Sequence, residues 1–159
     1  MKNFWKNKKV LITGHTGFKG SWLTLWLKLL GSKIYGISLP PEDNDNLFDS
    51  LDLINEINHI ILDIRNRDQI KKAIYEIKPE FIFHLAAQPL VIEGYKKPSL
   101  TWETNVNGTI NVLESLRTLD NKCSAVFITT DKVYENKEWI YGYRENDKLG
   151  GYDPYSSSK

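Results

Sequence analysis

Cysteine is almost absent from this sequence, and neither sign of charge is in excess. Cys123 is the only cysteine among 159 residues, so no disulfide can form within the chain, and we expect this side chain to be a small core residue in a reducing compartment. The 21 basic and 20 acidic side chains give a formal net charge of +1. Such a balance provides no broad attraction to nucleic acid or to an anionic membrane, so any anionic ligand must be held by a local site.

Long hydrophobic runs are also missing. The lysine-containing start is followed by an apolar stretch, residues 10–13, that Gly14 cuts short, which is unlike a secretion signal. The longest apolar run, residues 22–30, is interrupted by Thr24 and Lys28 and is far shorter than a membrane-spanning helix. We therefore expect a soluble protein of the cytoplasm that has no membrane partner.

What the sequence does have is the composition and patterning of one compact α/β domain. Apolar residues make up 41% and charged residues 26% of the 159 residues, a length that suffices for one core but not for two ordinary domains. Short apolar runs, which predict strands, alternate with stretches of helical spacing. The predicted strands are Lys9–Thr13, Lys33–Leu39, His59–Ile64, Phe81–Ala86 and Ala125–Thr129, and the predicted helices are Trp22–Leu30, Asn66–Lys78 and Ser99–Leu119. This alternation predicts a doubly wound parallel sheet, the Rossmann fold, with strand order 3-2-1-4-5.

Two of the predicted helices differ in their apolar faces. Residues 22–30 are apolar on nearly every side, which is typical of a helix packed between a sheet and other elements. In residues 99–119, four side chains share a face that is predicted to pack inward: Val106, Thr109, Leu113 and Leu116. Residues 40–56 and 131–154 are weakly patterned and are predicted to be surface loops, the first with room for a short helix.

Three glycines, Gly14, Gly17 and Gly20, form the pattern G-x-x-G-x-x-G between the first predicted strand and the first predicted helix. Glycine at such a turn accepts backbone angles that other residues avoid, and it lets a dinucleotide pyrophosphate approach the amides at the helix N-terminus. An ordinary strand-to-helix turn is the alternative, but the strand-turn-helix context favours the dinucleotide site. The pattern is not a Walker loop, because the Lys-Ser/Thr pair is missing. Lys19 could contact phosphate or ribose, or it could be solvated.

Side chains near the ends of the second and third strands bear on which nucleotide is bound. Asp63 could accept a hydrogen bond from an adenine amino group, or it could be a cap or a surface carboxylate. NAD-binding chains often carry an acidic residue after strand two, and NADP-binding chains an arginine. Here Ser38 and Leu39 provide neither, and the first arginine is Arg65. NAD is favoured because a 2′-phosphate has no predicted partner.

Tyr155 and Lys159 are four residues apart, which places them on one face of a helix. A free tyrosine ionises near pH ~10 and is a poor base at neutral pH. A neighbouring ammonium group favours the phenolate and makes the residue a competent base. This Tyr-Lys spacing alone is common by chance. Its position after the fifth predicted strand, in a chain that begins with a glycine turn, makes it a specific signal of a catalytic pair.

Polar side chains also follow the fifth predicted strand, at Thr129, Thr130, Asp131 and Lys132. A hydroxyl, a carboxyl and an ammonium group emerging together could divide hydrogen-bonding, acid and base roles over one substrate. A polar turn with an Asp-Lys ion pair is the alternative, and it would be preferred if this segment stood alone.

Six segments together resemble the nucleotide-sugar dehydratases of the extended short-chain dehydrogenase family, most closely those that act on CDP-glucose. They are 14–20 (GHTGFKG), 85–91 (LAAQPLV), 104–109 (TNVNGT), 129–135 (TTDKVYE), 143–147 (YREND) and 150–155 (GGYDPY). Lys132 is the most telling residue, since the related dehydratases of dTDP-glucose and GDP-mannose have a glutamate in its place. The resemblance extends from Phe4 to Lys159.

The resemblance implies that NAD is regenerated in each turnover, that CDP-glucose is the substrate and that no metal ion takes part. The residues that would contact NAD come from the glycine turn, the strand ends and the long helix: Gly14, His15, Thr16, Gly17, Phe18, Lys19, Gly20, Asp63, Ile64, Leu85, Ala86, Ala87, Asn105, Thr129, Tyr155 and Lys159. Asn105 would also support the backbone of the active site.

The resemblance also implies how the side chains divide a dehydration. Tyr155 would take the proton of the sugar 4-hydroxyl, helped by a hydrogen bond from Thr130, while C4 gives hydride to NAD. Lys159 would hold the ribose and lower the pKa of Tyr155. The ketone at C4 acidifies the C5 hydrogen, and Lys132 occupies the position of a base at C5. Asp131 would be the acid for loss of the C6 hydroxyl, and hydride then returns to C6.

Two positions depart from the family pattern, since Ile92 and Gly94 stand where relatives have arginine and serine. The resemblance further implies that residues 1–159 are an incomplete NAD-binding domain, without the C-terminal domain that binds the nucleotide sugar. A homodimer or homotetramer is expected for the full-length protein, paired through the helix near Asn105 and the helix that begins at Tyr155. Pairing of the fragment should be impaired.

Other functions remain as alternatives. An epimerase or reductase of the same superfamily would lack the pair formed by Asp131 and Lys132. A non-catalytic, redox-sensing NAD-binding module commonly loses the tyrosine or the lysine, and both are present here. The aromatic residues Trp139, Tyr141 and Tyr143 could form a patch for a partner protein, although their loop also suits a cover over the sugar site.

We expect the 159-residue chain by itself to have negligible dehydratase activity. The resemblance implies that the helix carrying Tyr155 and Lys159 continues beyond residue 159 in relatives, and that the cytidine is bound by a region beyond it. Incubation of the purified chain with NAD and CDP-glucose, followed by mass spectrometry of the sugar, checks this expectation. Turnover of CDP-glucose by the chain alone would contradict it.

Overall fold

A single parallel sheet organises the chain in the computed structural model, which describes residues 2–41 and 45–159. Its strands are β1 (Lys9–Thr13), β2 (Lys33–Ser38), β3 (Asn58–Ile61), β4 (Phe81–His84) and β5 (Ser124–Phe127). They lie in the order β3-β2-β1-β4-β5, and every neighbouring pair is parallel. The predicted Rossmann order is confirmed. The last four strands end one to three residues earlier than predicted, so several predicted strand-end residues lie in loops.

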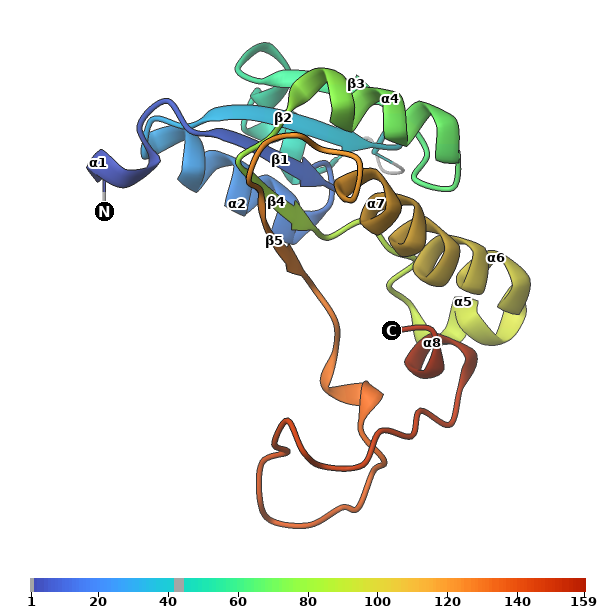
Figure 1. Ribbon diagram of the computed structural model, residues 1–159. Helices are drawn as coiled ribbons and strands as arrows, with labels where there is room; N and C mark the ends of the chain where they lie inside the picture. The colour runs from blue at the N-terminus through green and yellow to red at the C-terminus, as the bar shows by residue number, and fades with distance from the viewer. Residues whose placement is uncertain (1, 42–44) are drawn as a thin grey trace.

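The alternation of side chains along β1 explains why the core has two layers. Leu11 packs in one cluster with Ile37 and Ile82, whereas Val10 and Ile12 pack in another. Successive residues of a strand point to opposite faces, and here both faces are covered. The helices α4 (Arg67–Ile77) and α7 (Gly108–Leu116) cover the first face, and α2 (Phe18–Leu29) with the short α1 (Lys2–Trp5) covers part of the second (Figure 1).

The first long helix, α2, begins four residues earlier than predicted. Its buried residues are mostly small: Gly20, Ser21, Thr24 and Leu27. The side chains of Trp22, Trp26 and Leu29 are 51%, 58% and 67% exposed. The prediction that this helix is packed on nearly every side is therefore wrong, because the small residues approach the sheet and the large ones point outward.

Among the residues that the structure describes, neither this helix nor any other has the length and apolar character needed to cross a membrane.

The long helix predicted at residues 99–119 is a continuous helical run with a change of hydrogen bonding. It consists of α6 (Pro98–Trp102), a π-helical turn η2 (Glu103–Asn107) and α7. A π turn contains an extra residue and so shifts the phase of the helix after it. The buried side becomes Thr101, Asn105, Gly108, Asn111, Val112 and Ser115. Leu113, predicted to pack inward, is 45% exposed, so the predicted face is wrong at this position.

Two short helices lie in the segment that was predicted to be a loop with room for one. α3 (Leu47–Ser50) is capped by the side chain of Asn46, which accepts the N–H of Asp49, and η1 (Leu53–Asn55) follows. Phe48 is 1% exposed and anchors α3 to the domain. Residues 42–44 of the predicted loop lie outside the described residues.

The segment after β4 and the segment after β5 contain further short elements. α5 (Val91–Lys96) was not predicted. The predicted loop 131–154 begins with η3 (Asp131–Val133) and ends at α8 (Pro154–Ser157), and an isolated antiparallel bridge joins Tyr134 to Leu149 within it. Figure 1 shows this segment extending away from the sheet before the chain returns to α8 beside α5.

Candidate functional site

The glycine turn lies against the end of β4 with almost no space between the two backbones. Gly14 has a φ of +74°, which favours glycine, and its N–H donates to the carbonyl of Ile37 at 2.7 Å. A Cβ on Gly14 would lie 2.7 Å from the nitrogen of Ala86, and a Cβ on Gly20 would lie 2.1 Å from the carbonyl oxygen of Gly14. Both positions therefore require glycine.

The beginning of α2 presents backbone amides to solvent. Gly17 is its N-cap residue, no side chain caps the helix, and Gly17, Phe18 and Lys19 are exposed. The first N–H groups of a helix have no partner within it and carry a partial positive charge. Thr16 is turned towards β2, because its hydroxyl lies 2.9 Å from Oγ of Ser38. The amides are thus the groups of this turn that suit an anion such as pyrophosphate.

His15 differs from its neighbours in the turn. Its ring is fully buried, and its Nε2 lies 2.6 Å from Nδ1 of His59. Burial, together with the nearby His59, lowers the pKa of His15 to about 4, so the ring is neutral at neutral pH. The side chain points into the protein, so only the backbone of His15 faces the position of a ligand at the turn.

The carboxylate of Asp63 is held by Arg65. It accepts the backbone N–H of Arg65 at 2.9 Å and guanidinium N–H groups at 2.6 to 3.1 Å. These hydrogen bonds lower the pKa of Asp63. Ile64 is buried, and the side-chain amide of Asn111 donates to the carbonyls of Ile64 and Arg65 at 3.0 and 3.1 Å. The roles of Arg65 and Asn111 were missed, because nothing in their local sequence indicates these partners.

Asn105 connects the loop after β4 to the end of the chain. It is buried in the π turn, where its Oδ1 accepts the N–H of Gln88 at 2.8 Å. Its Nδ2 donates to the carbonyl of Gln88 at 3.1 Å and to Oγ of Ser158 at 2.8 Å. Residues 85–87, which immediately precede Gln88, are partly exposed at the edge of the sheet. π turns occur frequently at functional sites, and this one carries the residue that braces the loop.

His84, which the sequence did not single out, joins the glycine turn to the same π turn. Its Nδ1 lies 2.7 Å from Oγ1 of Thr13, which also accepts the N–H of Ala86 at 3.2 Å. Its Nε2 lies 3.1 Å from Oγ1 of Thr109, and Thr109 donates to the carbonyl of Asn105 at 2.6 Å. A buried histidine with a hydroxyl at each nitrogen is fixed in position. The signal available in the sequence was one polar residue at the end of an apolar strand.

The segment after β5 places three of the predicted catalytic residues together. Thr130 is the N-cap of η3, and its Oγ1 accepts the N–H of Lys132 at 3.4 Å and donates to Oδ1 of Asp131 at 3.1 Å. Thr129, Asp131 and Lys132 are exposed. Within the described chain Asp131 and Lys132 form no ion pair with each other, so the simple ion-paired turn is not what forms here.

Tyr155 lies in the first turn of α8, which Asp153 caps. The carboxylate of Asp153 accepts the N–H of Tyr155 and of the next residue, both at 2.9 Å. α8 ends two residues before Lys159, which therefore lies beyond the helix that the spacing predicted. Nζ of Lys159 donates to the carbonyl of Ile128 at 3.0 Å, and burial lowers its pKa. For the described residues, the hydroxyl of Tyr155 has no hydrogen-bond partner.

These segments meet at the carboxyl edge of the sheet. α8 contacts η3, α5 and α6. Burial of Asp153 opposes its ionisation, but hydrogen bonds from Ser156 and Tyr155 and the charge of Lys132 hold its pKa below the usual range. Lys159 lies near enough to His84 to affect its pKa. The structure therefore brings together η3, α8 and the end of β4, and places Asp63 and Ile64 after β3 on the other side of the glycine turn.

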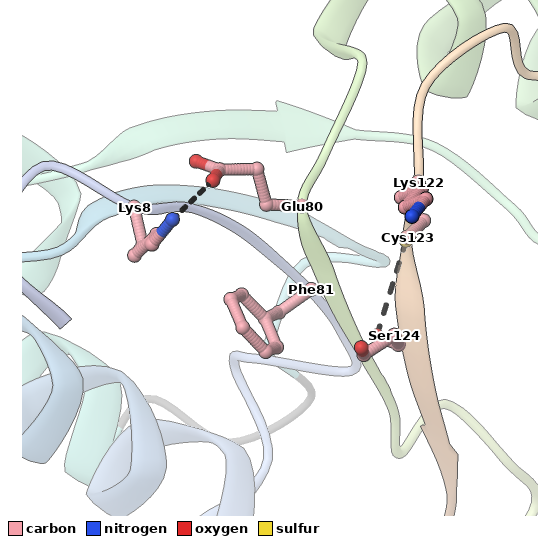
Figure 2. A pocket seen from close by; sticks show the side chains of 6 residues that line it. All are labelled: Lys8, Glu80, Phe81, Lys122, Cys123 and Ser124. Carbon is pink, nitrogen blue, oxygen red and sulfur yellow. Dashed lines mark hydrogen bonds and ion pairs between the residues drawn. The ribbon is translucent and has the colours of Figure 1, made fainter. Parts of the chain in front are cut away.

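A hollow at the opposite edge of the sheet shares no residue with the segments that meet at the carboxyl edge. Figure 2 shows its lining, in which Lys8 and Glu80 form an ion pair at 2.6 Å beside Phe81, Lys122, Cys123 and Ser124. These residues precede or begin β1, β4 and β5, so the hollow lies at the amino ends of the strands. Residues 2–41 and 45–159 also contain no group of three or more His, Cys, Asp or Glu side chains placed to bind a metal ion.

Comparison with known sequences finds one family along nearly the whole chain. A sequence model described as GDP-mannose 4,6 dehydratase matches residues 11–159. The chain is 49% identical over 158 residues to a CDP-glucose 4,6-dehydratase of Salmonella typhimurium, a match covering 99% of this chain and 44% of that protein. It is 33% identical over 174 residues to a CDP-paratose 2-epimerase of Salmonella typhi, covering 95% and 49%. The chain thus spans about half the length of the curated relatives it matches.

Solved structures agree on the fold. A UDP-glucose-4-epimerase from Stenotrophomonas maltophila with bound NAD superposes with a TM-score of 0.81 at 22% identity, covering 96% of this chain and 46% of that one. A UDP-glucose 4-epimerase from Thermus thermophilus in complex with NAD gives 0.78 at 25% identity, covering 95% and 47%. Over the matched part, which is about half of each solved chain, the fold is the same as in this chain.

His15 and His84 predict a loss of stability in mild acid. Burial first, and the charge of His59 or Lys159 second, lower the pKa of each ring from 6.5 to about 4. Between these values the unfolded chain binds more protons than the folded chain, so the free energy of unfolding falls as the pH falls. From pH ~7 to pH ~5 we expect a loss of about 2 kcal/mol for each ring.

Urea denaturation of the chain at the two pH values checks this expectation. Carboxylates with a lowered pKa change the free energy of unfolding mainly below pH ~5, so they add little to the difference between the two pH values. His84→Gln should remove about half of the pH-dependent loss. A free energy of unfolding that is flat over this interval would contradict the assignment.

Proposed function

The chain belongs to the GDP-mannose 4,6-dehydratase family, and from that membership we propose that the protein containing it uses NAD to convert CDP-glucose into CDP-4-keto-6-deoxyglucose. The observation that most supports CDP-glucose as substrate is the 49% identity to a CDP-glucose 4,6-dehydratase, which extends over 99% of the chain. Lys132 supports the same choice, because it distinguishes this chain from the dehydratases of other sugar nucleotides that it resembles.

The residues at the glycine turn fit NAD. The uncapped amides at the start of α2 would hold the pyrophosphate, and the missing side chains of Gly14 and Gly20 allow the turn to lie flat against β4. Asp63 and Ile64 would face the adenine, with Asp63 held ready by Arg65. Ser38 is engaged with Thr16 at the end of β2, where a 2′-phosphate would need a basic partner, and this favours NAD over NADP.

When bound, NAD would accept hydride from C4 of the sugar and return it to C6. The phenol of Tyr155, which has no partner within the described residues, would take the proton of the 4-hydroxyl. Lys159 would bind the nicotinamide ribose and stabilise the phenolate. Residues 85–87, Asn105 and Thr129 would line the same end of the cofactor.

The water-loss step would belong to the segment after β5. Thr130 would donate to the sugar oxygen at C4 on its oxidation, and Lys132 would remove the C5 proton that the ketone has made acidic. Asp131 would protonate the departing C6 hydroxyl. In the structure the hydroxyl of Thr130 already donates to Asp131, so the acid and the hydroxyl start in contact.

Partner and location are inferred from surface composition. The outward side of the helical run 98–116 carries Trp102, Ile110 and Leu113, each 45% to 47% exposed, and we propose that the full-length protein forms a homodimer or homotetramer through this helix. The formal net charge of the chain, +1, does not favour nucleic acid as a partner.

For location we propose the cytoplasm, because a single cysteine is typical of a reducing compartment.

A second candidate function is epimerisation of a nucleotide sugar, which the 33% identity to a CDP-paratose 2-epimerase favours. An epimerase leaves the mass of the sugar unchanged, whereas a dehydratase removes one water. Mass spectrometry of the product formed from CDP-glucose by the full-length protein therefore separates the two. A new chromatographic peak with the mass of CDP-glucose would replace dehydration by epimerisation as the proposed function.

Asp131→Asn in the full-length protein should slow water loss by about 10²–10⁴-fold, because an amide cannot protonate the leaving hydroxyl. Oxidation at C4 should continue, so the C5 hydrogen should still exchange with deuterium from solvent. Product mass and deuterium content, measured on the same sample, give the two rates.

Glu138→Gln is the matched control, since it removes one carboxylate from an exposed position on the same loop. We expect it to dehydrate CDP-glucose at the wild-type rate. Unchanged dehydration by the Asp131→Asn protein would show that another group is the acid.

A further inference from the structure

Gly36 leaves a gap in the middle of β2 that another residue fills. It pairs with Ile12 of β1 on one side and with His59 of β3 on the other. A glycine inside a strand weakens it and often marks the close approach of another group. A Cβ on Gly36 would lie 2.5 to 2.6 Å from three atoms of the His15 ring. The ring of His15 therefore occupies the space that a side chain at Gly36 would need.

His15 passes over β2 and reaches β3. Its Nε2 lies 2.6 Å from Nδ1 of His59, and the two ring centroids are 4.8 Å apart. Phe48 of α3 closes the pair, with its ring centroid 5.2 Å from that of His15 and 5.4 Å from that of His59. The other nitrogen of the His15 ring, Nδ1, is buried without a hydrogen-bond partner among the described residues. The contact of Nε2 with His59 therefore supplies the side-chain hydrogen bond of this buried ring.

This contact bears directly on the backbone of the turn. The hydroxyl of Ser21 lies 3.2 Å from the carbonyl oxygen of His15 and 2.9 Å from that of Gly17, and a Cβ on Gly20 would lie 2.7 Å from Cα of His15. A shift of the His15 ring would therefore move both the turn and the first residues of α2. A loop that is fixed before a ligand arrives loses less conformational freedom on binding.

We propose that His15 and His59 form a tether across β2 that fixes the glycine turn in the shape that receives a dinucleotide pyrophosphate. His15 is then a positioning residue whose side chain does not touch the cofactor, and Gly36 is retained at the centre of β2 to admit its ring. The inference rests on the proposed NAD site for its ligand, but the tether itself is a property of the chain.

Gly36→Ala in the full-length protein is the sharpest test. It keeps both histidines and adds a single methyl group where the ring lies, at a residue whose φ lies outside the left-handed region. At such a position alanine would otherwise be neutral or stabilising. We expect NAD to bind about tenfold more weakly and the hydrogen-bonded amides of Gly14, Gly17 and Ser21 to exchange faster. Isothermal titration and hydrogen–deuterium exchange by mass spectrometry measure the two effects.

Variants of His59 give an independent test. His59 is only partly buried, so His59→Ala should fold, and we expect the same two effects. His59→Asn, which can still form a hydrogen bond from β3, should restore part of the affinity. Ile74→Val is the control, because it loosens the core beneath α4 on the opposite face of the sheet. It should lower stability without changing the affinity for NAD.

Wild-type affinity together with wild-type exchange at Gly14, Gly17 and Ser21 in the His59→Ala protein would overturn the tether. An equal loss of affinity in Ile74→Val would overturn it as well. If Gly36→Ala fails to fold, the His59 variants decide. Failure of the wild-type protein to bind NAD would instead refute the proposed cofactor, while the exchange rates at Gly14, Gly17 and Ser21 would still decide whether the tether exists.

Discussion

The contact of two backbones at the centre of the sheet is the constraint around which this domain is arranged. Gly14 and Gly20 lie where a Cβ would collide with the end of β4 or with the turn itself. Hydrogen bonds run along the same line of contact, from Gly14 to Ile37 and from Leu85 to Thr13. Because buried backbone groups need partners, this line fixes the turn against β1, β2 and β4 together. The exposed amides of α2 face outward as a result.

A chain of hydrogen-bonded polar groups connects the end of the sheet to the C-terminal helix α8. Thr13, His84, Thr109 and Asn105 are connected in sequence by hydrogen bonds, and Asn105 continues to Ser158. Inside a protein such bonds are stronger than in water, but each unpaired member would be costly. Ser158 follows Tyr155 by three residues and precedes Lys159, so the position of the candidate base depends on residues of β1, β4 and the helical run 98–116. The neutral state of His84 is part of this arrangement, since a charged ring could not accept the hydroxyl proton of Thr13.

The parts of the molecule that the sequence predicted are those with local signals. Five apolar runs, their spacing and the glycine pattern were enough for the strand order and the place of the turn. The errors arose where a distant partner decides. In the sequence Trp22 and Trp26 resemble core residues, but in the structure smaller residues of the same helix face the sheet. The inward ring of His15 depends on Gly36 and His59, and the π turn that exposes Leu113 depends on packing around Asn105, so no short segment reveals either.

The exposure of Asp131 and Lys132 has an evolutionary consequence. Neither side chain supports the hydrophobic core, and substitutions at exposed positions usually change folding stability little. The proposed acid and base can therefore be exchanged while the sheet and its glycine turn stay as they are. A parallel sheet that does not depend on these two side chains for its folding is compatible with relatives that include both dehydratases and epimerases.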